Sequence, residues 1–160
     1  MNKVIFSFLI VITFITSGYA QDSVAINHDS TNIWQQDFSN AEKLTKSKDK
    51  PLLTFFTGSD WCGPCKMLVS DVFESEKFNK EVQNDFVLYE ADFPRNKDLV
   101  TTSQRSDNYK LKNKYNVSSY PTIVIVNGKG KALGKMKGYN LMRDTSYHYT
   151  FFDDILKDNQ

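Results

Sequence analysis

The chain has 160 residues, of which 40% are hydrophobic and 14% are aromatic, and its formal net charge at pH 7 is +1. This length and composition are typical of one compact domain with an apolar core, and they exclude a disordered or fibrous chain. Because lysines and arginines are spread along the whole sequence, with no basic block and no acidic tail, we expect no nucleic-acid partner.

Residues 1–20 have the pattern of a secretory signal peptide. Lys3 precedes an apolar run from Val4 to about Ile15, and small side chains follow at a cleavage site after Ala20. The run is shorter than the ~20 residues of a membrane-spanning helix, and polar residues follow it, so a membrane anchor is the disfavoured alternative. We therefore expect a periplasmic or secreted protein with no stable membrane insertion after cleavage.

After this segment the sequence predicts a flexible polar arm at 21–33 and one domain at 34–160. The first apolar pattern, over residues 38–45, predicts an amphipathic helix. An Asn or Ser near its start is available as the N-cap, and Lys50-Pro51 ends it. Residues 52–57, LLTFFT, have the length and composition of a strand that is buried on both faces.

Beyond this strand the predicted elements alternate between helix and strand and end with a hairpin and a helix. The hairpin turns at Asn127-Gly128, a dipeptide that favours tight turns. In chain order we expect a turn at 58–60, a helix from Cys62 through Phe73, a short helix around Phe78 and Val82, a strand at 86–91, a long surface loop at 94–107, a short helix at 109–115, strands at 122–126 and 131–137, and a terminal helix from Tyr149 to Leu156. This order predicts an α/β sandwich whose central mixed sheet carries helices on both faces.

Cys62 and Cys65 are the only two cysteines, and most kinds of cysteine site do not suit them. A structural staple is disfavoured, because a disulfide between them closes a loop of only a few residues and adds little stability. Zinc and iron–sulfur sites need about four ligands, and the chain adds only His28 and His148, neither at ligand spacing, so we expect no metal. Two thiolates suit Cu(I), but a third ligand nearby is missing.

A redox pair uses every residue of CGPC. If a helix begins next to Cys62, the backbone N–H groups of its first turn favour the thiolate, which is the nucleophilic form. Cys65 lies three residues along the same helix face, so it can close a disulfide with Cys62 and expel a bound partner. Pro64 costs no hydrogen bond in a first turn, and Gly63 leaves room for a substrate backbone. The pair itself carries two electrons, so no bound cofactor is expected.

Two side chains beside the pair have alternative roles. Lys66 either lies in solvent, which the weakness of exposed charge effects favours, or places a cation near the Cys62 sulfur. Trp61 either shields the disulfide and offers a flat apolar contact surface, or packs beside the turn as an ordinary core residue.

WCGPC after a buried strand, followed about sixty residues later by Tyr120-Pro121-Thr122 leading into TIVIV, resembles the thioredoxin superfamily. The resemblance extends from about Trp34 to the C-terminus and implies a thioredoxin-like three-layer sandwich. It also implies that Pro121 is preceded by a cis peptide bond and faces the cysteines, and that the backbone of Tyr120 pairs with a substrate peptide. The substrate-binding residues expected in this way are Trp61, Gly63, Pro64, Tyr120 and Pro121.

Several features depart from the thioredoxin pattern. Thioredoxins carry a buried acid on the strand that enters the motif, which assists proton transfer at the resolving cysteine, but LLTFFT has no carboxylate. The turn FTGSDWC is one residue longer than usual and resembles that of exported bacterial thioredoxin-like proteins; we interpret Asp60 as a solvated turn residue, not as a substitute base. Gly63-Pro64 resembles reducing thioredoxins, whereas Ser119-Tyr120-Pro121-Thr122 is similar to protein disulfide isomerases.

These features predict an exported thiol–disulfide oxidoreductase that acts on protein cysteines. Cys62 attacks a substrate disulfide and Cys65 resolves the mixed disulfide, with reduction favoured over oxidation as the direction. The resemblance implies a membrane thiol-electron carrier as the source of electrons, and we expect a monomer. The alternative is a non-catalytic module that binds peptides or a partner through the surface around Tyr120 and Trp61; it predicts no reversible interconversion between thiols and disulfide.

Overall fold

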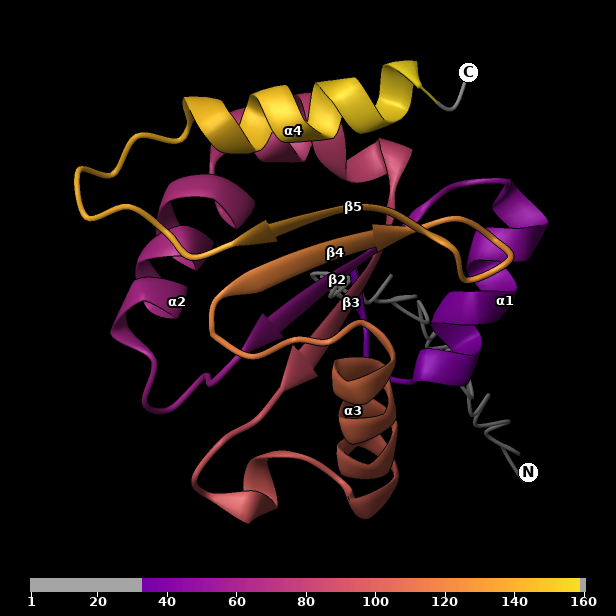
Figure 1. Cartoon of the computed structure of the whole chain (residues 1–160), viewed down its shortest axis with the longest axis vertical. Coiled ribbons are helices and arrows are strands. Elements are labelled where there is room, and N and C mark those ends of the chain that lie inside the picture. The colour runs from indigo at the N-terminus through magenta and orange to yellow at the C-terminus, as the bar shows by residue number, and fades with distance from the viewer. Residues whose placement is uncertain (1–32, 159–160) are drawn as a thin grey trace, which may run out of the picture. The chain divides into compact units, whose positions relative to one another are not determined.

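A computed structural model of the protein describes residues 33–158, in which a five-stranded mixed sheet has helices on both faces (Figure 1). The strand order is β1-β3-β2-β4-β5, with β1, β3 and β2 parallel to one another and β4 and β5 antiparallel to their neighbours. The strands are β1 (Trp34–Gln35), β2 (Leu52–Thr57), β3 (Val87–Asp92), β4 (Thr122–Val126) and β5 (Ala132–Lys137). The expected α/β sandwich with a mixed central sheet is confirmed.

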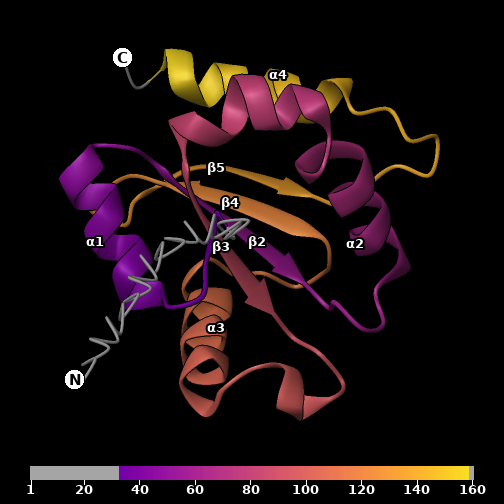
Figure 2. The same ribbon diagram turned by 180° about the vertical axis from the view of Figure 1, so that it is seen from behind.

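Within residues 33–158, four α-helices and several short helical turns surround the sheet, and the two opposite views show their arrangement (Figures 1 and 2). The helices are α1 (Phe38–Lys48), α2 (Gly63–Leu68), α3 (Thr102–Lys114) and α4 (Ser146–Lys157). The short turns are π-helical at Val69–Phe73 and Phe78–Val82 and 3₁₀ at Gln83–Asp85 and Lys97–Leu99. The chain therefore passes from α2 directly into a π-helical turn.

The sheet separates two apolar cores. On the face that we call the cysteine face, the strands contribute Leu53, Phe55, Leu88, Ile123 and Ile125, and α2, α4 and residues 69–86 cover them. On the opposite face, the strands contribute Leu52, Phe56, Val87, Tyr89, Ala91, Val124 and Val126 beneath α1 and α3. Because β2 is central and covered on both sides, all of its residues are buried, as its continuous apolar run predicts.

The N-terminal part of the domain differs from the prediction in two details. Trp34 and Gln35 form a short strand beside β3, which the sequence pattern did not indicate. The N-cap of α1 is Asp37, not an Asn or Ser: its carboxylate accepts hydrogen bonds from Asn40 N (2.8 Å) and Ser39 Oγ (2.6 Å). An aspartate at this position satisfies N–H groups that the helix itself leaves unpaired.

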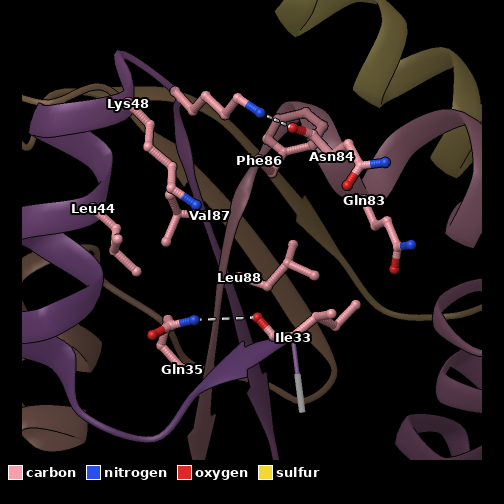
Figure 3. Close-up of a pocket in the computed structure, with 10 residues that line it drawn as sticks. Ile33, Gln35, Leu44, Lys48, Gln83, Asn84, Phe86, Val87 and Leu88 are labelled. Carbon is pink, nitrogen blue, oxygen red and sulfur yellow. Dashed lines mark hydrogen bonds between the residues drawn. The ribbon is translucent and has the colours of Figure 1, made fainter. Parts of the chain in front are cut away.

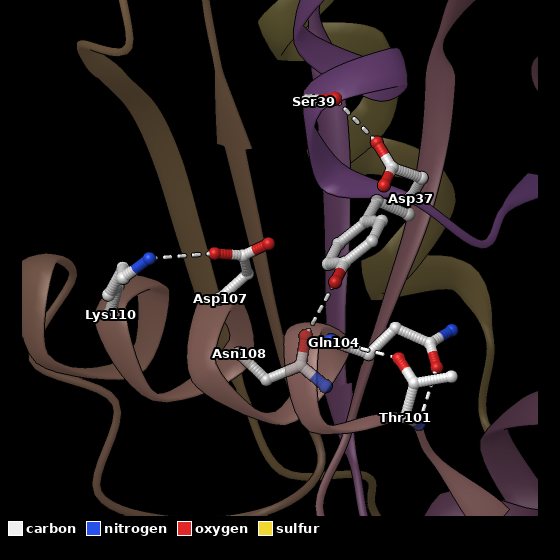
Figure 4. Close-up of polar contacts among 8 residues, drawn as sticks. Asp37, Ser39, Thr101, Gln104, Asp107, Asn108 and Lys110 are labelled. Atoms are coloured by element: carbon white, nitrogen blue, oxygen red, sulfur yellow. Dashed lines mark hydrogen bonds and ion pairs between the residues drawn. The ribbon is translucent and has the colours of Figure 1, made fainter.

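The expected surface loop at 94–107 is wrong in its second half, because α3 begins at Thr102 and runs for 13 residues. A capping box fixes its start, with Gln104 N donating to Thr101 Oγ1 (3.2 Å) and Thr101 N donating to Gln104 Oε1 (2.8 Å) (Figure 4). The helix is polar and buries only Asn108 and Leu111, so it lacks the apolar stripe from which helices are predicted.

The hairpin between β4 and β5 is confirmed, although its turn is longer than two residues. Asn127 N donates to Lys131 O (3.0 Å), and Gly130 takes the left-handed conformation (φ 73°) that glycine adopts without strain. The predicted signal peptide at 1–20 and nearly all of the predicted arm at 21–33 lie outside the described residues. Among residues 33–158, every helix falls short of the length and hydropathy that crossing a bilayer requires.

Candidate functional site

Cys62 and Cys65 lie where the chain leaves β2 and enters α2, and a disulfide joins them, with 5.2 Å between their Cα atoms. Cys62 is the N-cap of α2: its backbone is extended (φ −86°, ψ 99°), and its Sγ accepts a hydrogen bond from Cys65 N (3.3 Å). The turn before it is closed by Cys62 N, which donates to Gly58 O (2.8 Å). The order strand, turn, helix places both sulfurs at the end of a rigid central strand.

The two cysteines have unequal access to solvent. Cys62 is 4% exposed and Cys65 is 1% exposed, so Cys62 is the sulfur that a partner reaches first. A Cβ atom added at Gly63 would meet no atom within 4 Å, so the outward side of the disulfide is open beside that glycine. Pro64 occupies the first turn of α2, where its missing N–H costs no intrahelical hydrogen bond.

An aromatic cluster flanks the disulfide. Trp61 is 39% exposed, and its Nε1 donates to Phe93 O (2.9 Å). Its ring meets the edge of Tyr120 (5.8 Å between centroids), and Tyr120 in turn stacks on Phe93 (5.3 Å). Trp61 therefore packs beside the turn and also presents surface to solvent. Gly58 is required for this arrangement, because a Cβ there would lie 2.3 Å from the indole ring.

The loop before β4 lies against this cluster. The Tyr120–Pro121 peptide bond is cis, as the family resemblance implies. Pro121 is buried, and its carbonyl oxygen accepts a hydrogen bond from Gly138 N (2.8 Å), which ties the end of β5 to the same region. Contact between Tyr120 and Trp61 brings this loop beside the cysteine turn, so the expected site residues come together from separate parts of the chain.

Asp60 and Lys66 have structural contacts. The Asp60 carboxylate accepts hydrogen bonds from Asn96 N (2.8 Å) and Arg95 N (3.0 Å), and these bonds lower the pKa of Asp60. The Lys66 ammonium donates to Asp60 O (3.3 Å). Asp60 is exposed, as expected, and its carboxylate also holds the loop after β3. The Lys66 ammonium bonds to a carbonyl oxygen of the turn, not to the Cys62 sulfur.

Two acids of β3, Asp92 and Glu90, lie on the cysteine face of the sheet, and the sequence interpretation did not single them out. Asp92 is buried and accepts hydrogen bonds from Ser59 N (2.8 Å) and Ser59 Oγ (2.5 Å), three residues before Cys62. Glu90 is half-buried; burial and then the nearby Asp92 raise the pKa of Glu90 to about 7. The available signal was the strand Tyr89-Glu90-Ala91-Asp92 itself, because acids are rare in strands of α/β sheets.

A pocket of about 210 Å³ lies at the other end of the strands, between the C-terminal end of α1 and the start of β3 (Figure 3). Lys48 and Leu44 from α1 and Phe86 and Leu88 from the β3 side line it, and Lys50 donates to Asn84 O at its rim. The disulfide follows the last residues of β2, so this pocket is not part of the cysteine site.

His148 is the histidine that lies within residues 33–158; it belongs to α4 and packs against Tyr139. Burial lowers the pKa of His148, which favours the neutral ring. Across residues 33–158, no group of three or more His, Cys, Asp or Glu side chains is arranged to hold a metal ion. His28 lies outside the described residues.

The model of the thioredoxin-like domain family matches residues 38–145. The thioredoxin-related protein DsbJ of Chlamydia pneumoniae is 32% identical over 140 residues, which cover 83% of this chain and 40% of DsbJ. The disulfide bond reductase DsbH of the same organism is 32% identical over 107 residues, which cover 67% of this chain and 64% of DsbH. The chain thus spans less than two thirds of the length of both relatives.

A solved structure of a DsbH oxidoreductase superposes with a TM-score of 0.66 and is 29% identical, covering 78% of this chain and 83% of that one. The similarity includes the five-stranded sheet and the helices that flank it.

Proposed function

Because the chain belongs to the family of thioredoxin-like domains, we propose that it is a thiol–disulfide oxidoreductase that exchanges disulfides with protein cysteines through Cys62 and Cys65. The observation that carries the proposal is the disulfide at the start of α2, where the Cys62 sulfur accepts a hydrogen bond from the backbone N–H of Cys65. A hydrogen bond to the charged form favours the thiolate once the pair is reduced.

In the reductive direction, the Cys62 thiolate attacks a substrate disulfide and one substrate sulfur leaves. Cys65 then attacks Cys62, and the second substrate sulfur leaves as the disulfide of the protein forms. The open side at Gly63 admits the substrate backbone, the exposed part of Trp61 offers an apolar contact, and the Tyr120–Pro121 loop offers backbone groups for pairing. No bound cofactor enters this cycle, since the cysteine pair holds the two electrons.

We further propose that the protein is exported by residues 1–20 and works as a reductase, supplied with electrons by a membrane thiol carrier. Support for reduction comes from the Gly63-Pro64 dipeptide and from similarity to a protein named a disulfide bond reductase. Outside the cytosol, glutathione and thioredoxin do not maintain reduced thiols, so a dedicated electron donor is needed.

The first test is the reduction potential of the pair, measured by equilibrating the protein with dithiothreitol or glutathione buffers and trapping the free thiols. A value near about −270 mV supports a reductase, and one above about −200 mV indicates an oxidant or isomerase. If no reversible couple exists, the enzyme proposal fails and a binding module replaces it.

The second test separates the two cysteines. Cys65→Ser should trap substrates as mixed disulfides on Cys62, because the sulfur that releases them is absent. Cys62→Ser is the matched control and should trap far less, since the remaining sulfur is 1% exposed. Equal trapping by both variants would contradict the assigned roles.

A further inference from the structure

Glu90 lies on the same face of the sheet as the disulfide. Parallel pairing of β2 and β3 places it beside Phe55, which belongs to the core cluster that contains both cysteines. Leu88, two residues before Glu90, packs in that cluster as well, whereas Tyr89 and Ala91 pack in the core of the opposite face. Because side chains alternate along a strand, Glu90 points to the cysteine face.

Glu90 is also the first residue of β3 beyond the end of β1. The short strand β1 pairs Trp34 with Leu88 and Gln35 with Tyr89, and it ends there. Glu90 therefore has a strand neighbour on the β2 side only, and its side chain is half-buried instead of fully enclosed. A proton on this carboxyl group can exchange with water at the end of β1 while the disulfide lies in the core.

Aromatic side chains pack on this face beside the strand partner of Glu90. The rings of Phe55 from β2, Trp34 from β1 and Phe73 from the helical turn after α2 pack against one another on this face. The charged neighbour is Asp92, which also lies on the cysteine face and accepts two hydrogen bonds from Ser59. Burial and then this neighbouring carboxylate raise the pKa of Glu90 to about 7, so both of its protonation states are populated near neutral pH.

We propose that Glu90 is the acid–base residue that takes the proton of the Cys65 thiol and returns it, in place of an acid on β2. The strand that enters the motif is LLTFFT, and Phe55 of that strand is the residue paired with Glu90. Glu90 therefore lies on β3, the strand next to β2, and on the same face of the sheet as Phe55. This inference rests on the thiol–disulfide exchange proposed above.

In the resolving step, the Glu90 carboxylate takes the proton from Cys65, and the Cys65 sulfur attacks Cys62 Sγ of the mixed disulfide. The Cys62–Cys65 bond forms, the bond from Cys62 to the substrate sulfur breaks, and that sulfur leaves as a thiolate. The cysteine pair loses two electrons, and the substrate disulfide gains them. The proton on Glu90 passes to water at the end of β1, and the substrate thiolate takes one from water. In the reverse reaction Cys65 is the leaving group, and Glu90 supplies its proton.

The first test needs no substrate. The Cys65 thiol is titrated in the reduced protein by the ¹³Cβ chemical shift, in the wild type, in Glu90→Gln and in the exposed control Glu74→Gln. Loss of a nearby negative charge favours the thiolate, so Glu90→Gln should shift the Cys65 midpoint to lower pH by about one unit, and Glu74→Gln should leave it unchanged. An unchanged midpoint in Glu90→Gln would overturn the inference.

The second test measures the resolving step in single turnovers between pH 5 and 9. Glu90→Gln should slow this step about 100-fold at pH 7, without slowing the first attack by Cys62, and Glu90→Asp should recover part of the loss. Wild-type rates in Glu90→Gln would overturn the inference, as would an Asp variant no faster than the Gln variant. If the wild type itself formed no mixed disulfide, the proposed function would fail, and the titration would still decide whether Glu90 and Cys65 interact.

Discussion

Tyr89 and Glu90 are consecutive residues of β3 whose buried polar groups have opposite surroundings. Tyr89 points to the opposite face, where its hydroxyl donates to Asn108 Oδ1 (2.6 Å) and Asn108 Nδ2 donates to Asp92 O (2.9 Å). Glu90 points to the cysteine face, where its charged neighbour is another carboxylate. The polar groups of Tyr89 and Asn108 have hydrogen-bond partners, so this network stabilises a single conformation. The Glu90 carboxyl group is desolvated beside a like charge, which raises its pKa toward neutral pH and suits it to proton transfer.

Strand β3 thus separates a hydrogen-bonded network on one face from the proposed acid–base residue on the other. Burial raises the pKa of Tyr89 well above its usual range, so that hydroxyl remains a neutral donor at any physiological pH. Glu90, one residue away, changes its charge near neutral pH. Substitutions on the two faces should therefore have separable effects. A change in the Tyr89 network should lower stability at every pH, whereas a change of Glu90 should alter the chemistry and the pH dependence of stability.

The largest expected effect is at the cysteine face. Cys62→Ser should reduce disulfide exchange to the rate without protein, because a serine hydroxyl does not replace a thiolate as the attacking group. The assay is reduction of a model protein disulfide, with Ser70→Ala, an exposed change on the helical turn after α2, as the control. Turnover by Cys62→Ser at the normal rate would end the proposed mechanism.

The second effect is a pH dependence of stability that Glu90 causes. Its pKa is about 7 in the folded protein and 4.5 ordinarily, so the folded state holds the proton more tightly. The contribution is complete below pH 4.5 and is lost as the pH rises through 7, at a cost of up to about 3 kcal/mol. Glu90→Gln should remove this loss, so that the variant gains stability over the wild type at pH 8 but not at pH 4.

Urea unfolding at several pH values measures this second effect, and Glu74→Gln serves again as the exposed control. A Glu90→Gln variant whose stability fell with pH as steeply as that of the wild type would show that another group is responsible.

On the opposite face, Asn108→Ala should lower the free energy of unfolding by about 2 kcal/mol. It removes the acceptor of the buried Tyr89 hydroxyl and the donor to Asp92 O. The exposed Asn113→Ala in the same helix should cost far less. The reduction potential should stay the same in both variants; a changed potential in Asn108→Ala would mean that the two faces are coupled.

The smallest expected effect concerns the loop after β5. Arg143 and Tyr139 donate hydrogen bonds to Asp71, and they lower the pKa of Asp71 to about 2. A lowered pKa stabilises the fold above the ordinary pKa, and this contribution is lost as the pH falls through about 2. Arg143→Ala should therefore lower the melting temperature slightly at pH 7 and leave it almost unchanged below about pH 2, so that stability depends less on pH in acid; the exposed Lys129→Ala is the control.

Much of the fold follows from local patterns in the sequence. The apolar runs at Leu52–Thr57 and Thr122–Val126 predicted the two central antiparallel strands with the bounds that the structure has. Patterns fail where an element has little apolar surface of its own. Helix α3 buries two residues, and β1 has only two residues, each of which pairs with a β3 residue 54 positions later (34 with 88, 35 with 89).

The cysteine site was largely predictable because its residues are adjacent in sequence and chemically distinctive. That Pro121 faces the cysteines was implied only by the family resemblance, and the ring contact between Tyr120 and Trp61 was not predicted, since no local pattern brings these two segments together. Glu90 was missed for a similar reason: its position beside Phe55 depends on the register of two strands that are separated by a helix and several turns. Register is a tertiary property, whereas composition and spacing are local.

The contact between Asn108 and Asp92 has a further consequence for the edge of the sheet. Phe93 N donates to Thr57 O, so the Asp92 carbonyl points away from β2, to the side where β1 has already ended. Asn108 Nδ2 donates a hydrogen bond to this carbonyl oxygen, in the place where the backbone N–H of a neighbouring strand would donate. This acceptor is therefore not available to an extended peptide from a second molecule, and the exposed lysines of β5, Lys135 and Lys137, disfavour docking at the other edge. The occupied carbonyl of β3 and the charged strand β5 thus disfavour edge-to-edge pairing with another chain at these two places.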